Sequence, residues 1–302
     1  MSAASESSPR LPPAQRRRSR PALDSARGAA VIVVALTLLG LGLRLSMLGD
    51  SLFGDELSTY YIVAGHSFGQ VMHLLNNHSV ELNPPLFFIL TWVSQSIFGL
   101  STESLRLVSL LAGTATIPLT FLLGRKIGPR TGLVAAALAA LCPFMIYYST
   151  EARAYALMAF LVLAAALALL RALRSPGWGW WVLYALGTCA AAYTHYISVF
   201  ALIALALWAL TTQPVARLRI LTALAGAALL YIPELPVLRA TSRSSGTGIM
   251  GFLDPLSVHS VRVDLSHWAI GHPYVSLTQV PGTVALVLIG IALAAAVSAA
   301  AL

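Results

Sequence analysis

The sequence predicts an all-α, polytopic membrane protein, and three observations carry this prediction. Hydrophobic residues make up 58% of the 302 residues and charged residues only 10%, whereas soluble domains carry about 25% charged residues. The mean hydropathy is +0.79. Apolar segments long enough to cross a hydrocarbon core of about 30 Å recur along the chain. The net charge of +8 does not indicate nucleic acid, because most basic residues fall where the positive-inside rule places them, in the tail and inner loops.

The N-terminal segment differs in composition from the rest of the chain. Residues 1–28 are polar and rich in arginine, serine and proline, so we expect a basic, disordered cytoplasmic tail. The first apolar run, Ala29 to Leu48, contains one charge, Arg44. Six arginines precede this run and should keep its amino end in the cytoplasm. Residues 29–302 are expected to form one transmembrane module in the cytoplasmic (inner) membrane.

Eight further apolar segments follow the first span. Counting all of them as spans would place Arg125, Lys126 and Arg130 outside the cell, against the positive-inside rule. The segment 84–98 reaches only about 22 Å as a helix, so we predict an interfacial helix capped by Asn83. The other seven segments bring the total to about eight transmembrane helices: 105–123, 131–147, 155–173, 180–194, 197–212, 218–238 and 281–302.

This topology creates two outer loops, 49–104 and 239–280. The first is expected to hold amphipathic juxtamembrane helices, one after Asp55 and one opened by the capping-box pattern Ser67 to Gln70. All seven histidines, and nine of the 11 acidic residues, fall outside or near the outer ends of spans. Solubility alone gives no reason for this bias, so the sequence predicts a functional site that faces outward.

An acidic pair, Asp55 and Glu56, follows the first span directly. Acidic groups at the lipid boundary are costly unless they serve a function. Asp55 can act as a general base, or it can simply cap the helix that begins at Glu56. Successive helical residues point about 100° apart, so both carboxylates cannot face one substrate atom.

Five further motifs follow the acidic pair in a fixed order. They are Glu81-Leu82-Asn83-Pro84-Pro85-Leu86, the segment from Arg106 to Gly113, Gly124-Arg125-Lys126, Glu151-Ala152-Arg153-Ala154-Tyr155 and Thr194-His195-Tyr196. Over residues 29–240 the ordered set resembles the C-type glycosyltransferases of the protein O-mannosyltransferase and lipid A aminoarabinose transferase-like superfamily. The chain departs from that family at Asn83, where relatives often carry Lys or His before the two prolines. Relatives also usually continue beyond the length of this chain, so an incomplete member is expected.

The resemblance implies an enzyme that moves a sugar from a polyprenyl-phosphate donor to a hydroxyl acceptor on a glycan, lipid or protein. It implies that Asp55 is the catalytic base and that the transfer is inverting. Glu56 is expected to support catalysis or to lie beside a metal. Two alternatives remain open: a catalytically inactive scaffold of the same fold, and a transporter of polyprenyl-linked glycans. The uncharged spans at 131–147, 180–194 and 197–212 count against transport.

The departing phosphate needs positive charge at the outer face. Arg153 is the first candidate, because a guanidinium fork suits phosphate oxygens, and Arg243 is the second. An ion pair with Glu151 is the alternative role for Arg153. His195 is expected either to donate to a phosphate or sugar hydroxyl or to be only an interfacial polar residue.

A divalent metal ion is the one cofactor that the residues suggest. Glu81 and His78 combine carboxylate and imidazole ligands, which suit zinc or manganese, although both can equally be solvated loop residues. Neither Cys142 nor Cys189 is expected to form a disulfide or to bind metal, since both lie in apolar runs. Arg106 and Glu103, three residues apart, are expected to form a structural pair.

Overall fold

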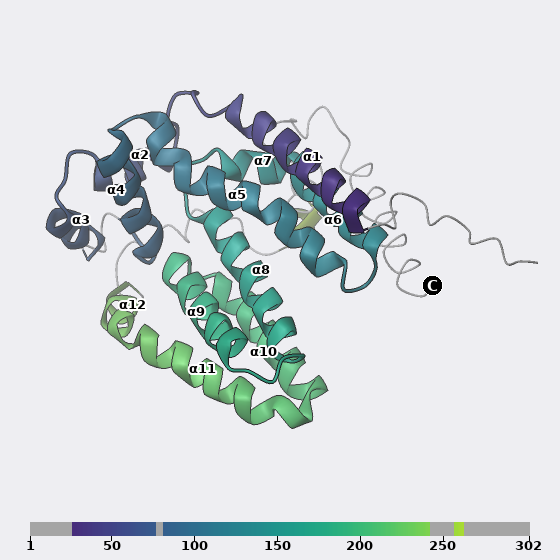
Figure 1. Cartoon of the computed structure of the whole chain (residues 1–302). Coiled ribbons are helices and arrows are strands. Elements are labelled where there is room, and N and C mark those ends of the chain that lie inside the picture. Colours follow the sequence, from purple (N-terminus) through teal and green to yellow (C-terminus); the bar gives the residue numbers. More distant parts are fainter. Residues whose placement is uncertain (1–25, 77–80, 242–256, 263–302) are drawn as a thin grey trace, which may run out of the picture.

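The structure is a computed structural model that describes residues 26–76, 81–241 and 257–262. Every regular element in these ranges is helical, so the predicted all-α class is confirmed. Figure 1 shows the long helices side by side, with the short helices α2, α3, α4 and α12 gathered at one end. The helices are α1 (Ala26–Leu45), α2 (Glu56–Val63), α3 (Phe68–Leu75), α4 (Leu86–Phe98), α5 (Thr102–Gly124), α6 (Pro129–Leu141), α7 (Pro143–Ser149), α8 (Tyr155–Ala172), α9 (Gly179–Thr194), α10 (Ser198–Thr212), η2 (Pro214–Ala216), α11 (Arg217–Tyr231), η3 (Ile232–Glu234) and α12 (Leu235–Thr241).

Four helices of the described residues are long and apolar enough to cross a bilayer, and a fifth span results if α6 and α7 are counted together. The four are Arg27–Leu45, Thr102–Gly124, Tyr155–Ala172 and Pro214–Thr241. The predicted spans at 180–194 and 197–212 form α9 and α10, which have only 16 and 15 residues. The predicted span at 281–302 lies outside the described residues. The chain is therefore a multi-pass membrane protein.

The run predicted as one span at 131–147 is broken at Cys142, where α6 and α7 meet at an angle of 58°. Cys142 has extended backbone angles, as expected for a residue that precedes a proline. The break leaves carbonyl groups of the last turn of α6 without helical partners. Arg44, which is fully buried, donates from Nη2 to the carbonyl of Ala139 (3.1 Å) and from Nη1 to that of Ala140 (3.3 Å).

Helix α4 begins at Leu86, two residues later than predicted, and Asn83 does not cap it. Instead the side-chain amide and backbone N–H of Asn83 both donate to Glu81 Oε1, which draws Asn83 away from the helix. The helix has 13 residues and falls short of a span, in keeping with the predicted interfacial position. The predicted capping box at Ser67 and Gln70 is confirmed at the start of α3.

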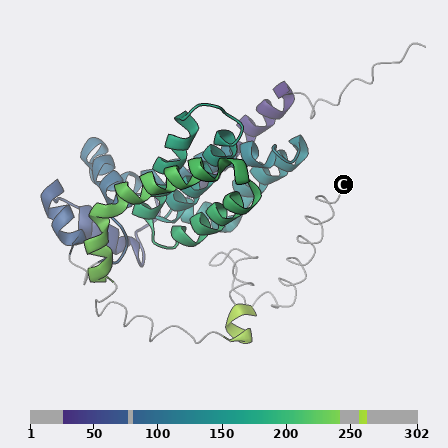
Figure 2. The same cartoon turned by 90° about the horizontal axis from the view of Figure 1, so that it is seen from below.

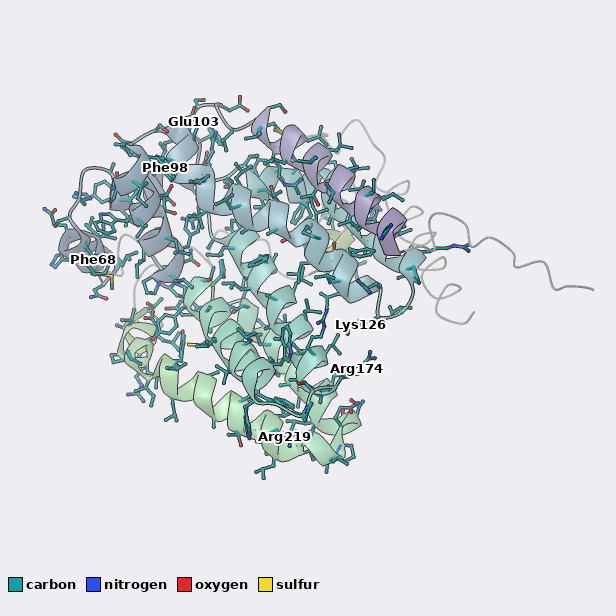
Figure 3. All side chains as sticks on the ribbon, in the orientation of Figure 1. Phe68, Phe98, Glu103, Lys126, Arg174 and Arg219 are labelled. Carbon is teal, nitrogen blue, oxygen red and sulfur yellow. The ribbon has the colours of Figure 1, made fainter. Side chains whose placement is uncertain are left out.

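Helix α5 lies centrally and packs against α1, α4, α6, α7 and α8. Its close approach to α7 depends on Gly113, because a Cβ atom there would overlap Ser149. Figure 3 shows Lys126, Arg174 and Arg219 toward one end of the molecule and Glu103 at the other. The basic inner loops predicted from the sequence thus lie at the end opposite to α2, α3 and α4.

Candidate active site

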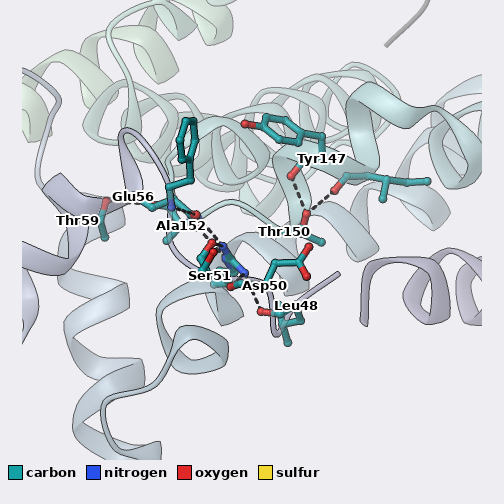
Figure 4. A network of polar contacts seen from close by, with 11 residues as sticks. Leu48, Asp50, Ser51, Glu56, Thr59, Tyr147, Thr150 and Ala152 are labelled. Atoms are coloured by element: carbon teal, nitrogen blue, oxygen red, sulfur yellow. Dashed lines mark hydrogen bonds and ion pairs between the residues drawn. The ribbon is translucent and has the colours of Figure 1, made fainter. Parts of the chain in front are cut away.

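The short connection between α7 and α8 runs beside the start of α2 and is fixed there by hydrogen bonds. The N–H of Ala152 donates to Glu56 Oε1 (2.7 Å), and the carbonyl of Ala152 accepts from Thr59 Oγ1 (2.8 Å). The carbonyl of Arg153 accepts from Ser109 Oγ on α5 (2.9 Å). The Glu-Ala-Arg motif noted in the sequence is therefore hydrogen-bonded to both α2 and α5. Figure 4 shows Ala152 beside Glu56 and Thr59.

One side of this connection is held by a buried ion pair between Glu56 and Arg106. Arg106 Nε and Nη2 each lie 2.7 Å from a Glu56 carboxylate oxygen. The remaining N–H groups of Arg106 donate to the carbonyls of Leu48, Asp50 and Ser51, the segment that precedes α2 in Figure 4. Arg106 thus joins α5 to the end of the first span and to the start of α2.

The predicted pairing of Arg106 with Glu103 is therefore wrong. Glu103 is exposed on the first turn of α5, whereas Arg106 is only 3% exposed and needs a buried partner. Glu56, at 3% exposed, supplies it. Both carboxylate oxygens of Glu56 are occupied by Arg106 and by the amides of Phe53 and Ala152. These contacts support a structural role for Glu56, and its catalytic role stays a prediction.

A second buried ion pair joins Arg153 to Glu81, with 2.9 Å between Nη1 and Oε2. Arg153 Nη2 also lies 4.0 Å from Asp55 Oδ2. The structure therefore brings together three of the predicted site residues. The alternative partner Glu151 contacts Arg153 only through the backbone, where its carbonyl accepts from the Arg153 N–H. Burial alone would raise the pKa of Glu81, but the charge and hydrogen bonds of Arg153 outweigh it and hold that pKa below its ordinary value.

Asp55 stands at the N-cap position of α2, yet its side chain makes no capping hydrogen bond. The side chain is 68% exposed, in contrast to the buried Arg153 and Glu81 around it. Gly54 adopts a φ of 57°, a left-handed conformation that favours glycine, and this turn sets the direction in which Asp55 leaves the chain. The side chain of Asp55 therefore does not cap α2 by a hydrogen bond, and its exposed carboxylate is accessible from solvent.

Glu81 is poorly suited to bind a metal ion. Its Oε1 accepts from the N–H groups of Leu82 and Asn83 and from the Asn83 side chain, and its Oε2 accepts from Ser58 and Arg153. Within the described residues, no group of three or more His, Cys, Asp or Glu side chains is placed to hold a metal. Its predicted partner His78, like Arg243, lies outside those residues, and metal dependence stays a prediction.

His195 follows α9 and lies beside the same network. Its ring centroid is 5.5 Å from that of Tyr155. Burial, and then the positive charge of Arg153, lower the pKa of His195. A neutral imidazole near the arginine can donate one hydrogen bond to a ligand, which agrees with the predicted polar role without deciding its partner.

Two cavities flank this network. A cavity of about 450 Å³ is lined by polar groups that include Asp50, Glu56, Arg106 and Glu151. An apolar cavity of about 300 Å³ lies between α1, α5, α7 and α8, and its lining includes Tyr155, two residues after Arg153. Tyr148 lines both cavities. Tyr148 was not among the residues predicted from the sequence, although its place three residues before the Glu-Ala-Arg motif was a usable signal.

Glu151 Oε2 is buried and has no hydrogen-bond partner among the described residues. Burial, and then the nearby negative charge of Glu56, raise the pKa of Glu151 from 4.5 to about 7. The folded protein therefore binds this proton more tightly than the unfolded chain does. The stabilisation from the protonated group is complete below about pH 4.5 and is lost as the pH rises through about 7.

We expect Glu151→Gln to remove this pH dependence, since glutamine stays uncharged at every pH. Thermal unfolding of detergent-solubilised protein between pH 4.5 and 8 measures the effect. The wild type should lose stability across this range relative to the variant. Parallel pH curves for the two proteins would contradict the raised pKa.

Comparisons with known proteins indicate the family and the fold of the chain. A family model described as dolichyl-phosphate-mannose-protein mannosyltransferase matches residues 82–238, just over half of the chain. No curated protein sequence matches. The fold is similar to the crystal structure of ArnT from Cupriavidus metallidurans bound to undecaprenyl phosphate, with a TM-score of 0.51 and 21% identity over 72% of this chain.

The matched region covers only 42% of the ArnT chain, so the present chain spans less than half of that protein. The family match includes Arg106, Arg153 and His195, and it begins one residue after Glu81 and well after Asp55. The resemblance drawn from the ordered motifs is confirmed by these two independent similarities. By its sequence, the chain belongs to the dolichyl-phosphate-mannose-protein mannosyltransferase family.

Proposed function

We propose that this chain acts as a membrane glycosyltransferase that moves a sugar from a polyprenyl-phosphate donor to a hydroxyl acceptor at the outer face. The observation that carries the proposal is the placement of an exposed carboxylate, Asp55, 4.0 Å from the buried guanidinium of Arg153. A base and a cation so close together meet the two needs of the transfer. The family match and the similarity to a structure that binds undecaprenyl phosphate support this assignment.

In the proposed reaction the acceptor oxygen attacks C1 of the sugar and forms the new glycosidic bond. Asp55 takes the proton from that oxygen. The bond from C1 to the phosphate oxygen breaks, and the polyprenyl phosphate leaves with the electron pair. Arg153 stabilises the phosphate, since its charge is fixed in place by Glu81 before any substrate arrives. Attack opposite to the departing phosphate inverts the configuration at C1.

The apolar cavity beside Tyr155 suits the start of the donor's isoprenoid chain, because its lining includes Tyr155, two residues after the arginine that would hold the phosphate. His195, whose ring lies 5.5 Å from that of Tyr155, would donate to the phosphate or to a sugar hydroxyl. Arg243, and a metal ion bound by Glu81 and His78, remain further predictions for the positive charge near the phosphate. No step above depends on either of them.

Arg153→Ala is expected to weaken binding of the polyprenyl-phosphate donor by roughly 10- to 100-fold, since charge-assisted hydrogen bonds contribute about 1.5–3 kcal/mol. Arg153→Lys should recover only part of the affinity, because lysine pairs with Glu81 but lacks the guanidinium fork. Binding of undecaprenyl phosphate to purified protein in nanodiscs is the measurement. Arg174→Ala, an exposed arginine at the opposite end, serves as the control.

Unchanged donor affinity in a folded Arg153→Ala variant would assign the phosphate to another residue. Donor binding without any sugar transfer would favour the inactive scaffold. Movement of the intact donor across the membrane of sealed vesicles that contain the protein would favour the transporter. Binding and transfer in nanodiscs, together with this vesicle assay, therefore separate all three functions.

A further inference from the structure

A third cavity, of about 580 Å³, lies between α3, α4, α9 and α12, away from the cavities described above. Its volume falls in the range of ligand pockets, about 300–1,000 Å³. Figures 1 and 2 both show α12 at the end of the molecule that carries α3 and α4. Most of the lining is apolar and includes Leu75, Leu86, Leu186 and Val237.

One acidic side chain, Glu234, lines this cavity from the short helix η3. It is only 4% exposed, and no described group donates a hydrogen bond to its Oε1. Burying a carboxyl group without a hydrogen-bond partner costs free energy. Glu56 and Glu81, which are also buried, accept hydrogen bonds from other residues of the fold. Glu151 resembles Glu234, since its Oε2 has no described partner. Glu234 therefore has the properties of a group whose partner is a ligand.

The cavity also borders the candidate active site. Asn83 lines it, and the Asn83 side chain donates to Glu81 Oε1 at 2.8 Å. Glu81 in turn pairs with Arg153, which lies close to Asp55. One wall of the cavity is thus a direct extension of the network that would hold the donor phosphate.

We propose that this cavity, hereafter the Glu234 cavity, binds the acceptor as an amphipathic molecule with more than one hydroxyl. One hydroxyl donates to the Glu234 carboxyl group, and another is the hydroxyl that receives the sugar. The apolar walls take the acceptor's hydrocarbon part, and Glu234 selects for a polar head that can donate. This inference rests on the proposed function in taking the occupant to be the acceptor. It separates the two substrates, with the donor on the Arg153 and Tyr155 side and the acceptor on the Asn83 side.

The free thiol of Cys189 provides a probe, because Cys189 lines the Glu234 cavity. In a Cys142→Ala background, the rate at which a small maleimide alkylates Cys189 reports whether the cavity is filled. Octyl glucoside below its micellar concentration represents a hydroxyl-bearing amphiphile. Its fully O-methylated form has the same apolar part without hydroxyl donors. The protein is held in lipid nanodiscs.

Octyl glucoside is expected to slow alkylation of Cys189 at least severalfold, and the methylated form is expected to have little effect. Glu234→Leu should abolish the protection. It should also raise the melting temperature, because it removes a buried carboxyl group that has no partner in the fold. A purely structural glutamate would show the opposite change in stability on substitution.

Equal protection by both glucosides, protection retained in Glu234→Leu, or a lower melting temperature for that variant would each overturn the proposal. Protection by octylammonium but not by octyl glucoside would also overturn it in favour of a cationic ligand. Asp55→Asn should keep the protection, since the assay reads binding and not turnover. Absence of protection in a protein that transfers sugar would therefore refute this inference alone. Protection in a wild-type protein that transfers no sugar would refute the proposed function alone.

Discussion

Asp55→Asn is expected to reduce sugar transfer by about 10²-fold or more, the loss typical of a missing acid–base group. Asparagine has nearly the same shape as aspartate but cannot take the acceptor's proton. The exposed position of Asp55 and the absence of a capping hydrogen bond mean that little of the fold depends on its charge. Expression, melting temperature and donor binding should therefore stay close to those of the wild type. Transfer is measured with a panel of polyprenyl-phosphate sugars.

Glu103→Gln is the matched control for this experiment. Glu103 is an exposed acidic residue at the same end of the molecule, and its substitution should leave transfer unchanged. A folded Asp55→Asn protein that transfers sugar at nearly the wild-type rate would remove Asp55 from the role of base. An equal loss of transfer in Glu103→Gln would show that transfer depends on the total negative charge of this face and not on the Asp55 carboxylate.

Arg106→Met is expected to prevent the outer part of the molecule from folding, an effect on stability and not on chemistry. The change strands Glu56 as a buried charge and removes the donors to the carbonyls of Leu48, Asp50 and Ser51. Removing one partner of a buried ion pair typically costs about 3–5 kcal/mol, a large part of the stability of a domain. Yield of monodisperse protein and melting temperature are the measurements.

The double variant Glu56→Gln with Arg106→Met should recover part of the lost stability, because the stranded charge is then gone. Arg174→Met, at an exposed arginine, should have little effect. A stable, well-folded Arg106→Met protein would show that the Glu56 pair contributes nothing to the fold. Recovery of transfer in the double variant would further show that Glu56 has no catalytic part.

The local features of the fold were predictable from the sequence because each depends on neighbouring residues. The helix after Asp55, the capping box at Ser67 and the short helix before Gly99 all follow from patterns within a few residues. The ordered motifs were enough to predict the family, which the comparisons confirm. The break at Cys142 was also visible in principle, since Pro143 interrupts the apolar run.

The pairing of buried charges was not predictable in the same way. Arg106 has an acidic neighbour three residues away, but its partner Glu56 is 50 residues distant in sequence. The two glutamates differ in burial, which the sequence does not state, and only the buried one needs a cation. Likewise Arg153 meets Glu81 across 72 residues. All four charged residues are evident in the sequence, but the ion-pair partner of each depends on how α2 and α5 pack around the Glu-Ala-Arg connection.

The hydrogen bonds of Arg44 have a consequence for how the protein is made. The carbonyls that receive its side chain belong to residues 95 and 96 positions later, so the ribosome needs roughly 5–20 s more to synthesise them. During that interval the first helix must enter the bilayer before Arg44 can donate to α6, although its Nη1 can already donate to the carbonyl of Gly40 in the same helix. The insertion machinery tolerates an arginine at about 2.5–3.5 kcal/mol even at mid-membrane. Arg44 stands at the last turn of α1, where its side chain can reach the headgroups until α6 arrives. The first helix is thus inserted before its hydrogen bonds to α6 can form, and they form only after α6 has been inserted.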